Sequence, residues 1–76
     1  MKVTYNPELD ILRVLLNESS NIEDSDEQKP GLIIDYDKDG NIIAFEILDA
    51  SRRVSNPALI QYEIAKSAWK NKNAYF

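Results

Sequence analysis

Two residue types with strong chemistry are missing from this 76-residue chain, which contains no cysteine and no histidine. The first absence excludes disulfides and thiolate metal sites, and the second excludes imidazole ligands and histidine-based acid–base catalysis. A domain of this size buries only about 60% of its unfolded surface, so it is marginally stable without disulfides or a structural metal. Association with a partner is the remaining way for the chain to gain buried area.

Long hydrophobic runs are also missing. No stretch approaches 18 consecutive apolar residues, so we expect no transmembrane helix and no membrane partner. The first residues lack the apolar run that is typical of a signal peptide. Hydrophobic residues still make up 43% of the chain, which is too many for a disordered protein. We therefore expect one cytoplasmic domain over residues 1–76.

The formal net charge of −4 conceals an asymmetry along the chain. Residues 1–50 carry 12 acids and 4 bases, a net charge of −8, whereas residues 51–76 carry 1 acid and 5 bases, a net charge of +4. Phosphate contacts need a basic face, so the acidic part argues against nucleic acid as a partner. The acidic segment 18–27 would instead attract a small basic protein and speed its association.

The first 50 residues have the pattern of a β-sheet. Alternation and strand-forming residues predict strands at 2–6 and 10–16, and a short third strand near 22–28. The strongest signal is a hairpin in which residues 32–37 and 41–48 flank Lys38-Asp39-Gly40, a sequence that suits a three-residue loop with a type I turn and a bulge. We expect a small antiparallel sheet of four to five strands.

The pattern changes after residue 50. Asn56 is a good helix N-cap, and Pro57 suits the first helical position because no amide is needed there. Apolar residues then recur at helical spacing in two adjoining stripes: Ile60, Ile64 and Ala68, and Ala58, Tyr62, Ala65 and Trp69. The sequence therefore predicts a C-terminal α-helix over residues 56–70 and an α+β fold.

The two faces of the main hairpin both look apolar. Pairing across Gly40 groups Leu32, Ile34, Tyr36, Ile42, Ala44 and Leu48 on one face, and Ile33, Ile43, Phe45 and Ile47 on the other. One helix covers only one face of a small sheet, so the second needs another molecule. We predict a homodimer or an obligate partner. The alternative is a strongly curled sheet that wraps its own core.

One acidic pattern matches the EF-hand calcium loop: Asp35-x-Asp37-x-Asp39-Gly40-x5-Glu46. An EF-hand needs helices on both sides of its loop, whereas strand-forming residues flank this one. We therefore expect these aspartates to cap a turn.

Carboxylates suitable for an acid–base pair or a two-metal hydrolytic site are Asp10, Asp35, Asp37, Glu46 and Asp49. No nucleophile elbow or glycine-rich phosphate loop accompanies them. We expect no enzymatic activity, no catalytic residues, no metal and no cofactor.

Three segments in order, 1–12, 31–43 and 46–51, resemble the small bacterial proteins of domain of unknown function family 2283 (DUF2283). The resemblance covers residues 1 to about 51. It departs from the family pattern at Asn6, where aspartate is common, and at Arg13-Val14, which replaces a tyrosine-isoleucine pair. The resemblance implies a small β-rich domain and supplies no catalytic residues. The family's shared aspartates correspond to Asp10, Asp35, Asp37, Asp39 and Asp49.

Members of that family are sometimes encoded beside small toxin-like proteins. Together with the acidic charge and the uncovered apolar face, this implies a non-enzymatic protein-binding module, antitoxin-like, that acts by occluding a partner. Two alternatives stay open. One is a small metal-dependent hydrolase that uses the hairpin carboxylates, and the other is a DNA-binding autoregulator that uses the basic segment with Arg52, Arg53, Lys66, Lys70 and Lys72.

Overall fold

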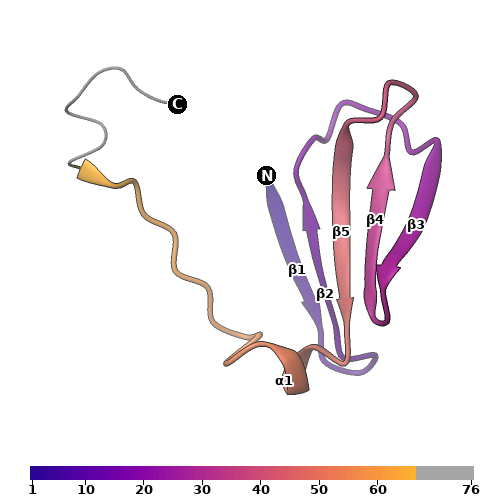
Figure 1. The fold of residues 1–76 in the computed structure, drawn as a ribbon. Coiled ribbons are helices and arrows are strands. Elements are labelled where there is room, and N and C mark those ends of the chain that lie inside the picture. Colours follow the sequence, from indigo (N-terminus) through magenta and orange to yellow (C-terminus); the bar gives the residue numbers. More distant parts are fainter. Residues whose placement is uncertain (67–76) are drawn as a thin grey trace.

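A computed structural model describes residues 1–66, in which five antiparallel strands form one sheet (Figure 1). The strands are β1 (Lys2–Asn6), β2 (Ile11–Leu15), β3 (Asp24–Lys29), β4 (Leu32–Tyr36) and β5 (Ile42–Leu48). Their order across the sheet is β1-β2-β5-β4-β3, so the last strand in sequence lies at the centre. The expectation of four to five antiparallel strands is confirmed.

The β4–β5 loop forms as its sequence predicts. The amide of Gly40 donates to the carbonyl of Asp37 at 3.1 Å, and the amide of Asp37 donates to the carbonyl of Asn41 at 2.9 Å. Gly40 has φ 84°, a left-handed conformation that glycine adopts without steric cost. The predicted three-residue loop is therefore confirmed.

The predicted grouping of residues on the hairpin faces is wrong beyond the first pair. Tyr36 pairs with Ile42 as expected, but Asp35 then pairs with Ala44, because the register shifts at that point and leaves Ile43 without a partner. A one-residue shift moves every later side chain to the opposite face. Leu32 and Ile34 therefore share a face with Ile47 and Phe45 rather than with Ala44 and Leu48.

The register divides the sheet into two unlike faces, because cross-strand partners point to the same side. We call one the apolar face; it is formed by Val3, Tyr5, Leu12, Val14, Leu32, Ile34, Phe45 and Ile47. The other, which we call the polar face, carries Thr4, Arg13, Glu46, Asp35 and Ser25 together with the apolar residues Ile11, Leu15, Ile33, Ala44 and Leu48. Only one face is therefore apolar throughout, which corrects the expectation of two.

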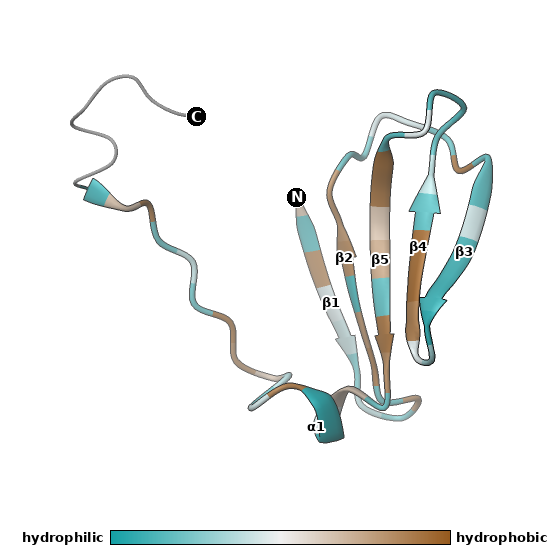
Figure 2. Cartoon of the chain, viewed as in Figure 1, coloured by the Kyte–Doolittle hydropathy of each residue, from teal (hydrophilic) through white to brown (hydrophobic). Residues whose placement is uncertain are grey.

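Few side chains in the described part of the chain are fully buried. The buried apolar residues are Ile43, Ala44 and Ala50, with exposed fractions of 1%, 0% and 0%. Hydrophobic residues run along β2, β4 and β5, whereas β3 is hydrophilic along most of its length (Figure 2). Over residues 1–66 the ribbon shows one layer of sheet with no second layer packed against it (Figure 1).

The predicted helix over residues 56–70 is wrong over most of its described part. Residues 57–65 are not helical, and the short helix α1 (Ala50–Arg53) lies before them. Asn56 does cap a turn: its side-chain oxygen accepts from the amide of Ala58, and its carbonyl accepts from the amide of Leu59, both at 3.1 Å. An isolated helix of this length is marginal in water without a surface to pack against. Residues 67–70 of the prediction lie outside the described residues.

Beyond this turn the chain leads away from the sheet (Figure 1). We call residues 55–66 the tail. Over residues 1–66, no helix has the length and apolar character needed to cross a membrane.

Candidate functional site

Asp35 and Glu46, two carboxylates of the EF-hand-like pattern, share one arginine on the polar face. The Nη1 atom of Arg13 lies 3.2 Å from Oδ2 of Asp35 and 3.5 Å from Oε2 of Glu46. The hydroxyl of Ser25 donates to the other Asp35 oxygen at 2.6 Å. Both carboxylates are therefore paired within the sheet. Sequence reasoning missed Arg13, which lies 22 residues from Asp35 along the chain.

Asp37 holds the β4–β5 loop together. Its Oδ1 atom accepts from the amides of Asp39 and Asn41, both at 2.9 Å, and its Oδ2 atom accepts from the Asn41 side-chain amide at 3.1 Å. The hydrogen bonds from the backbone and side chain of Asn41 are the main reasons why the pKa of Asp37 lies below its ordinary value. The expectation that the hairpin aspartates cap a turn is confirmed for Asp37.

Asp10 joins the β1–β2 turn to helix α1. Its carboxylate accepts from the Tyr5 hydroxyl at 2.8 Å, the Ser51 amide at 2.9 Å and the Ser51 hydroxyl at 2.7 Å. The Ser51 hydroxyl, followed by the Tyr5 hydroxyl, lowers the pKa of Asp10 below its ordinary value. Asp10 and Asp49 have φ 56° and 53°, a left-handed conformation that is uncommon outside glycine. Asp10 therefore positions a chain reversal.

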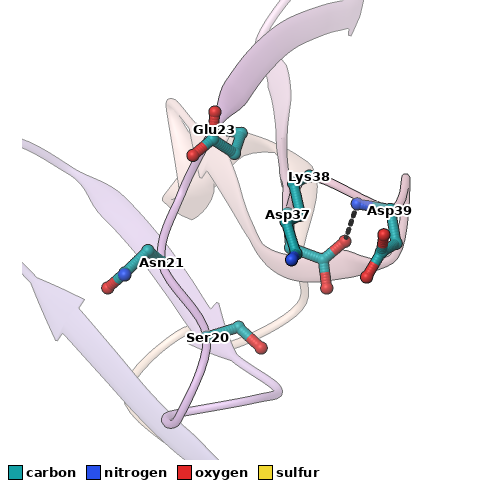
Figure 3. Close-up of a pocket in the computed structure, with 6 residues that line it drawn as sticks. All are labelled: Ser20, Asn21, Glu23, Asp37, Lys38 and Asp39. Carbon is teal, nitrogen blue, oxygen red and sulfur yellow. Dashed lines mark hydrogen bonds between the residues drawn. The ribbon is translucent and has the colours of Figure 1, made fainter.

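A shallow, polar hollow of about 330 Å³ lies where the β2–β3 connection meets the β4–β5 loop (Figure 3). It is lined by Ser20, Asn21, Glu23, Asp37, Lys38 and Asp39. In this hollow the Asp37 carboxylate accepts from the Asp39 backbone (Figure 3). Within residues 1–66, no group of three or more acidic, histidine or cysteine side chains is arranged to hold a metal ion.

The two arginines of the basic segment are placed differently. The guanidinium of Arg53 lies against Gly31, where an added Cβ atom would come within 2.7 Å of it. Arg52 is exposed at the end of α1. Lys70 and Lys72 lie outside the described residues, so Arg52, Arg53 and Lys66 are the bases of this segment that the structure describes.

The tail is the most exposed apolar part of the described chain. Its large apolar side chains have exposed fractions of 64% to 74%: Leu59, Ile60, Tyr62 and Ile64. Leu59 and Ile60, with residues 54–57, also line a groove of about 250 Å³, which Val3, Leu12 and Val14 of the apolar face line as well. The sequence left open whether the C-terminal segment packs on its own sheet or on a neighbour, and in the structure these four side chains are largely exposed to solvent.

Comparisons with known proteins bear on the sheet alone. A family model described as "Protein of unknown function (DUF2283)" matches residues 2–51. No curated protein and no solved structure matches the chain. The matched residues cover all five strands and the first two residues of α1, and the match ends before the tail begins.

Proposed function

The chain belongs to the DUF2283 family, whose function is unknown, and we propose that it is a non-enzymatic protein-binding module that holds its partner through the tail. The observation that carries this proposal is the exposure of Leu59, Ile60, Tyr62 and Ile64, four large apolar side chains within six residues. Exposed apolar clusters of this kind mark protein interaction sites in soluble proteins. The family's sheet would then serve as the platform from which the tail extends.

The tail has the properties of a segment that folds when it binds. The Asn56 turn already supplies the start of a helix, and residues 60 and 64 are spaced to lie on one helical face. What the tail lacks is a surface to pack against, and an apolar groove on a partner supplies that surface. A helix docked in this way would occlude the partner's groove, which is the antitoxin-like mode of action.

Charge at the far edge of the sheet adds to this proposal. The exposed acids Glu23, Asp24, Asp26 and Glu27 lie at or before strand β3, the edge opposite β1. Such a cluster attracts a basic protein and raises its association rate, and the effect weakens as salt is added. We therefore propose a small basic protein with an apolar groove as the partner.

The test is affinity capture of the tagged full-length chain from nuclease-treated native lysate, repeated with three single variants. Ile60→Asp and Ile64→Asp place a charge at the proposed anchors, whereas Gln61→Asp adds the same charge at the residue between them. We expect the wild type and Gln61→Asp to retain one small basic protein in near-stoichiometric yield, and the two isoleucine variants to lose it.

A second measurement examines the folding step. Far-ultraviolet circular dichroism of the complex should show more helix than the sum of its separated components, because residues 57–65 become helical on binding. Equal capture by all four chains, or no captured protein, would contradict the proposed function.

A further inference from the structure

The apolar face is a continuous surface without charge. Its eight residues come from β1, β2, β5 and β4, and every one of them is only half-buried. The central strand β5 contributes Phe45 and Ile47 to the middle of this surface. In the described chain, Val54 and the tail as far as Ile60 border this face, along the groove beside Val3, Leu12 and Val14. The face therefore resembles one half of a protein core.

The polar face has less need for a cover, although it also carries the half-buried residues Ile11, Leu15, Ile33 and Leu48. Arg13, Glu46, Asp35 and Ser25 satisfy one another across its middle, and Thr4 is exposed beside them. Antiparallel sheets commonly turn one such face to water and pack the other. The apolar face, which has no ion pair of its own, therefore has the stronger need for a cover.

We propose that a second copy of this chain packs on the apolar face, so that two sheets form a sandwich. The described part of one copy buries only three apolar residues completely, so the face must be covered whenever the domain is folded. Another copy of the chain is the one occupant that is always present in equal amount. An uncharged apolar surface also complements itself across a two-fold axis.

The available area is compatible with a modest dimer. The four strands that form the apolar face are spaced about 4.8 Å apart, and their residues rise about 3.3 Å along each strand, which gives a projected face of roughly 320 Å². A standard interface buries about 800 Å² of accessible surface per partner. The accessible surface of the face exceeds its projected area because side chains protrude from the sheet. The adjoining groove, which includes Val54 and Pro57, adds further area that can be buried. We therefore expect a dimer that dissociates on dilution.

Sedimentation equilibrium of the full-length chain over a wide concentration range is the first test. We expect the apparent mass to rise with concentration from the monomer value of 8.7 kDa toward twice that value. Val14→Lys, on the apolar face, should weaken the dimer at least tenfold. Thr4→Lys adds the same charge on the polar face and should leave the dissociation constant unchanged.

A crosslinking test covers the case in which Val14→Lys does not fold. Because the chain has no cysteine, Val14→Cys and Thr4→Cys each introduce a unique thiol. Packed sheets lie about 10 Å apart, which exceeds the reach of a disulfide, so a short bismaleimide is the suitable reagent. We expect Val14→Cys to give a covalent dimer and Thr4→Cys to remain monomeric.

Two results overturn the proposal. One is crosslinking of Thr4→Cys as efficient as that of Val14→Cys. The other is a chain that is monomeric at every concentration. In the second case, slow reaction of the Val14→Cys thiol with maleimide would show that the chain's own residues cover the apolar face. Fast reaction would show that the face is open and available to a different protein. These tests use variants of the sheet, and the affinity capture uses variants of the tail, so the dimer and the proposed partner are tested separately.

Discussion

The guanidinium of Arg13 lies 3.2 Å from the carboxylate of Asp35, although the two residues belong to strands that are not neighbours. Arg13 is on β2 and Asp35 on β4, and β5 lies between them with Glu46 3.5 Å from the same guanidinium. Asp35 is only 6% exposed, and its carboxylate accepts hydrogen bonds from Arg13 and Ser25 in place of water. One arginine therefore ties together the three central strands.

Removing this arginine should destabilise the sheet. Arg13→Met keeps most of the aliphatic length but leaves the buried Asp35 carboxylate without its cation, and we expect a loss of about 1–3 kcal/mol in the free energy of unfolding. Urea unfolding followed by circular dichroism measures this loss. Arg52→Met removes an exposed arginine and should change stability by less than about 0.5 kcal/mol. Equal effects of the two substitutions would show that the Arg13 pairing contributes nothing.

The contact between Arg53 and Gly31 predicts a difference between the two glycines. Both have φ 84°, so alanine at either position should cost about 1–2 kcal/mol from backbone strain alone. An added Cβ at Gly40 meets nothing within 4 Å, whereas one at Gly31 displaces the Arg53 guanidinium. The lost arginine packing should make Gly31→Ala worse than Gly40→Ala by about 0.5–1 kcal/mol. In an Arg53→Ala background this difference, measured by thermal unfolding, should disappear.

The hydrogen bonds to Asp10 predict an acid-dependent contribution to stability. Because the folded protein lowers the pKa of Asp10, its contribution is present above the ordinary value of 3.8 and is lost as the pH falls through the folded pKa. Ser51→Ala removes the hydroxyl that lowers the pKa of Asp10 most. We expect it to destabilise the protein at pH 7 and to approach the wild type as the pH falls below 3.8.

Unfolding measurements from pH 7 to pH 2 on the wild type and Ser51→Ala test this dependence. Ser55→Ala, an exposed serine in the tail, is the matched control and should follow the wild type throughout. A constant gap between wild type and Ser51→Ala at every pH would assign the effect of Ser51 to something other than ionised Asp10.

Local chemistry explains what the sequence predicts correctly. The loop at Gly40 and the cap at Asn56 depend on residues within a few positions of one another, and both form as expected. A helix beyond Asn56 depends on a packing surface outside its own residues, so the apolar stripe alone was insufficient to predict that it forms. The irregularity at Ile43 shifts the β4–β5 register by one residue, and nothing in the alternation of residues 41–48 marks that point.

Topology explains what the sequence does not predict. Arg13 meets Asp35 only because β5 enters the sheet between β2 and β4, an order that no local pattern encodes. The same order places both candidate carboxylates, Asp35 and Glu46, beside one cation. Asp10 and Ser51 are likewise 41 residues apart and meet because α1 returns to the β1–β2 turn. Such long-range contacts decide whether an acidic side chain is a free ligand or a structural partner.

Calcium gives a direct test of the EF-hand-like pattern. Asp37 is satisfied by the amides of its own loop, and Asp35 and Glu46 are paired with Arg13 on the polar face. Any ion that binds the folded state raises its melting temperature by mass action. We expect no rise with millimolar Ca²⁺, Mg²⁺ or Mn²⁺ relative to EDTA. A saturable rise that Asp37→Ala abolishes would support the metal-dependent alternative.

The tail should contribute little to the stability of the sheet. Ile64 is 64% exposed, so Ile64→Ser should change the free energy of unfolding by less than about 0.5 kcal/mol. Ile43 is 1% exposed, and shortening it to alanine should cost about 2–5 kcal/mol; Ile43→Val, at about 0.5–1.5 kcal/mol, replaces it if too little folded protein remains. Urea unfolding of the full-length variants gives both values. If Ile64→Ser were as damaging as the Ile43 variants, the tail would be packing on its own sheet in solution, and its apolar residues would not be free for a partner.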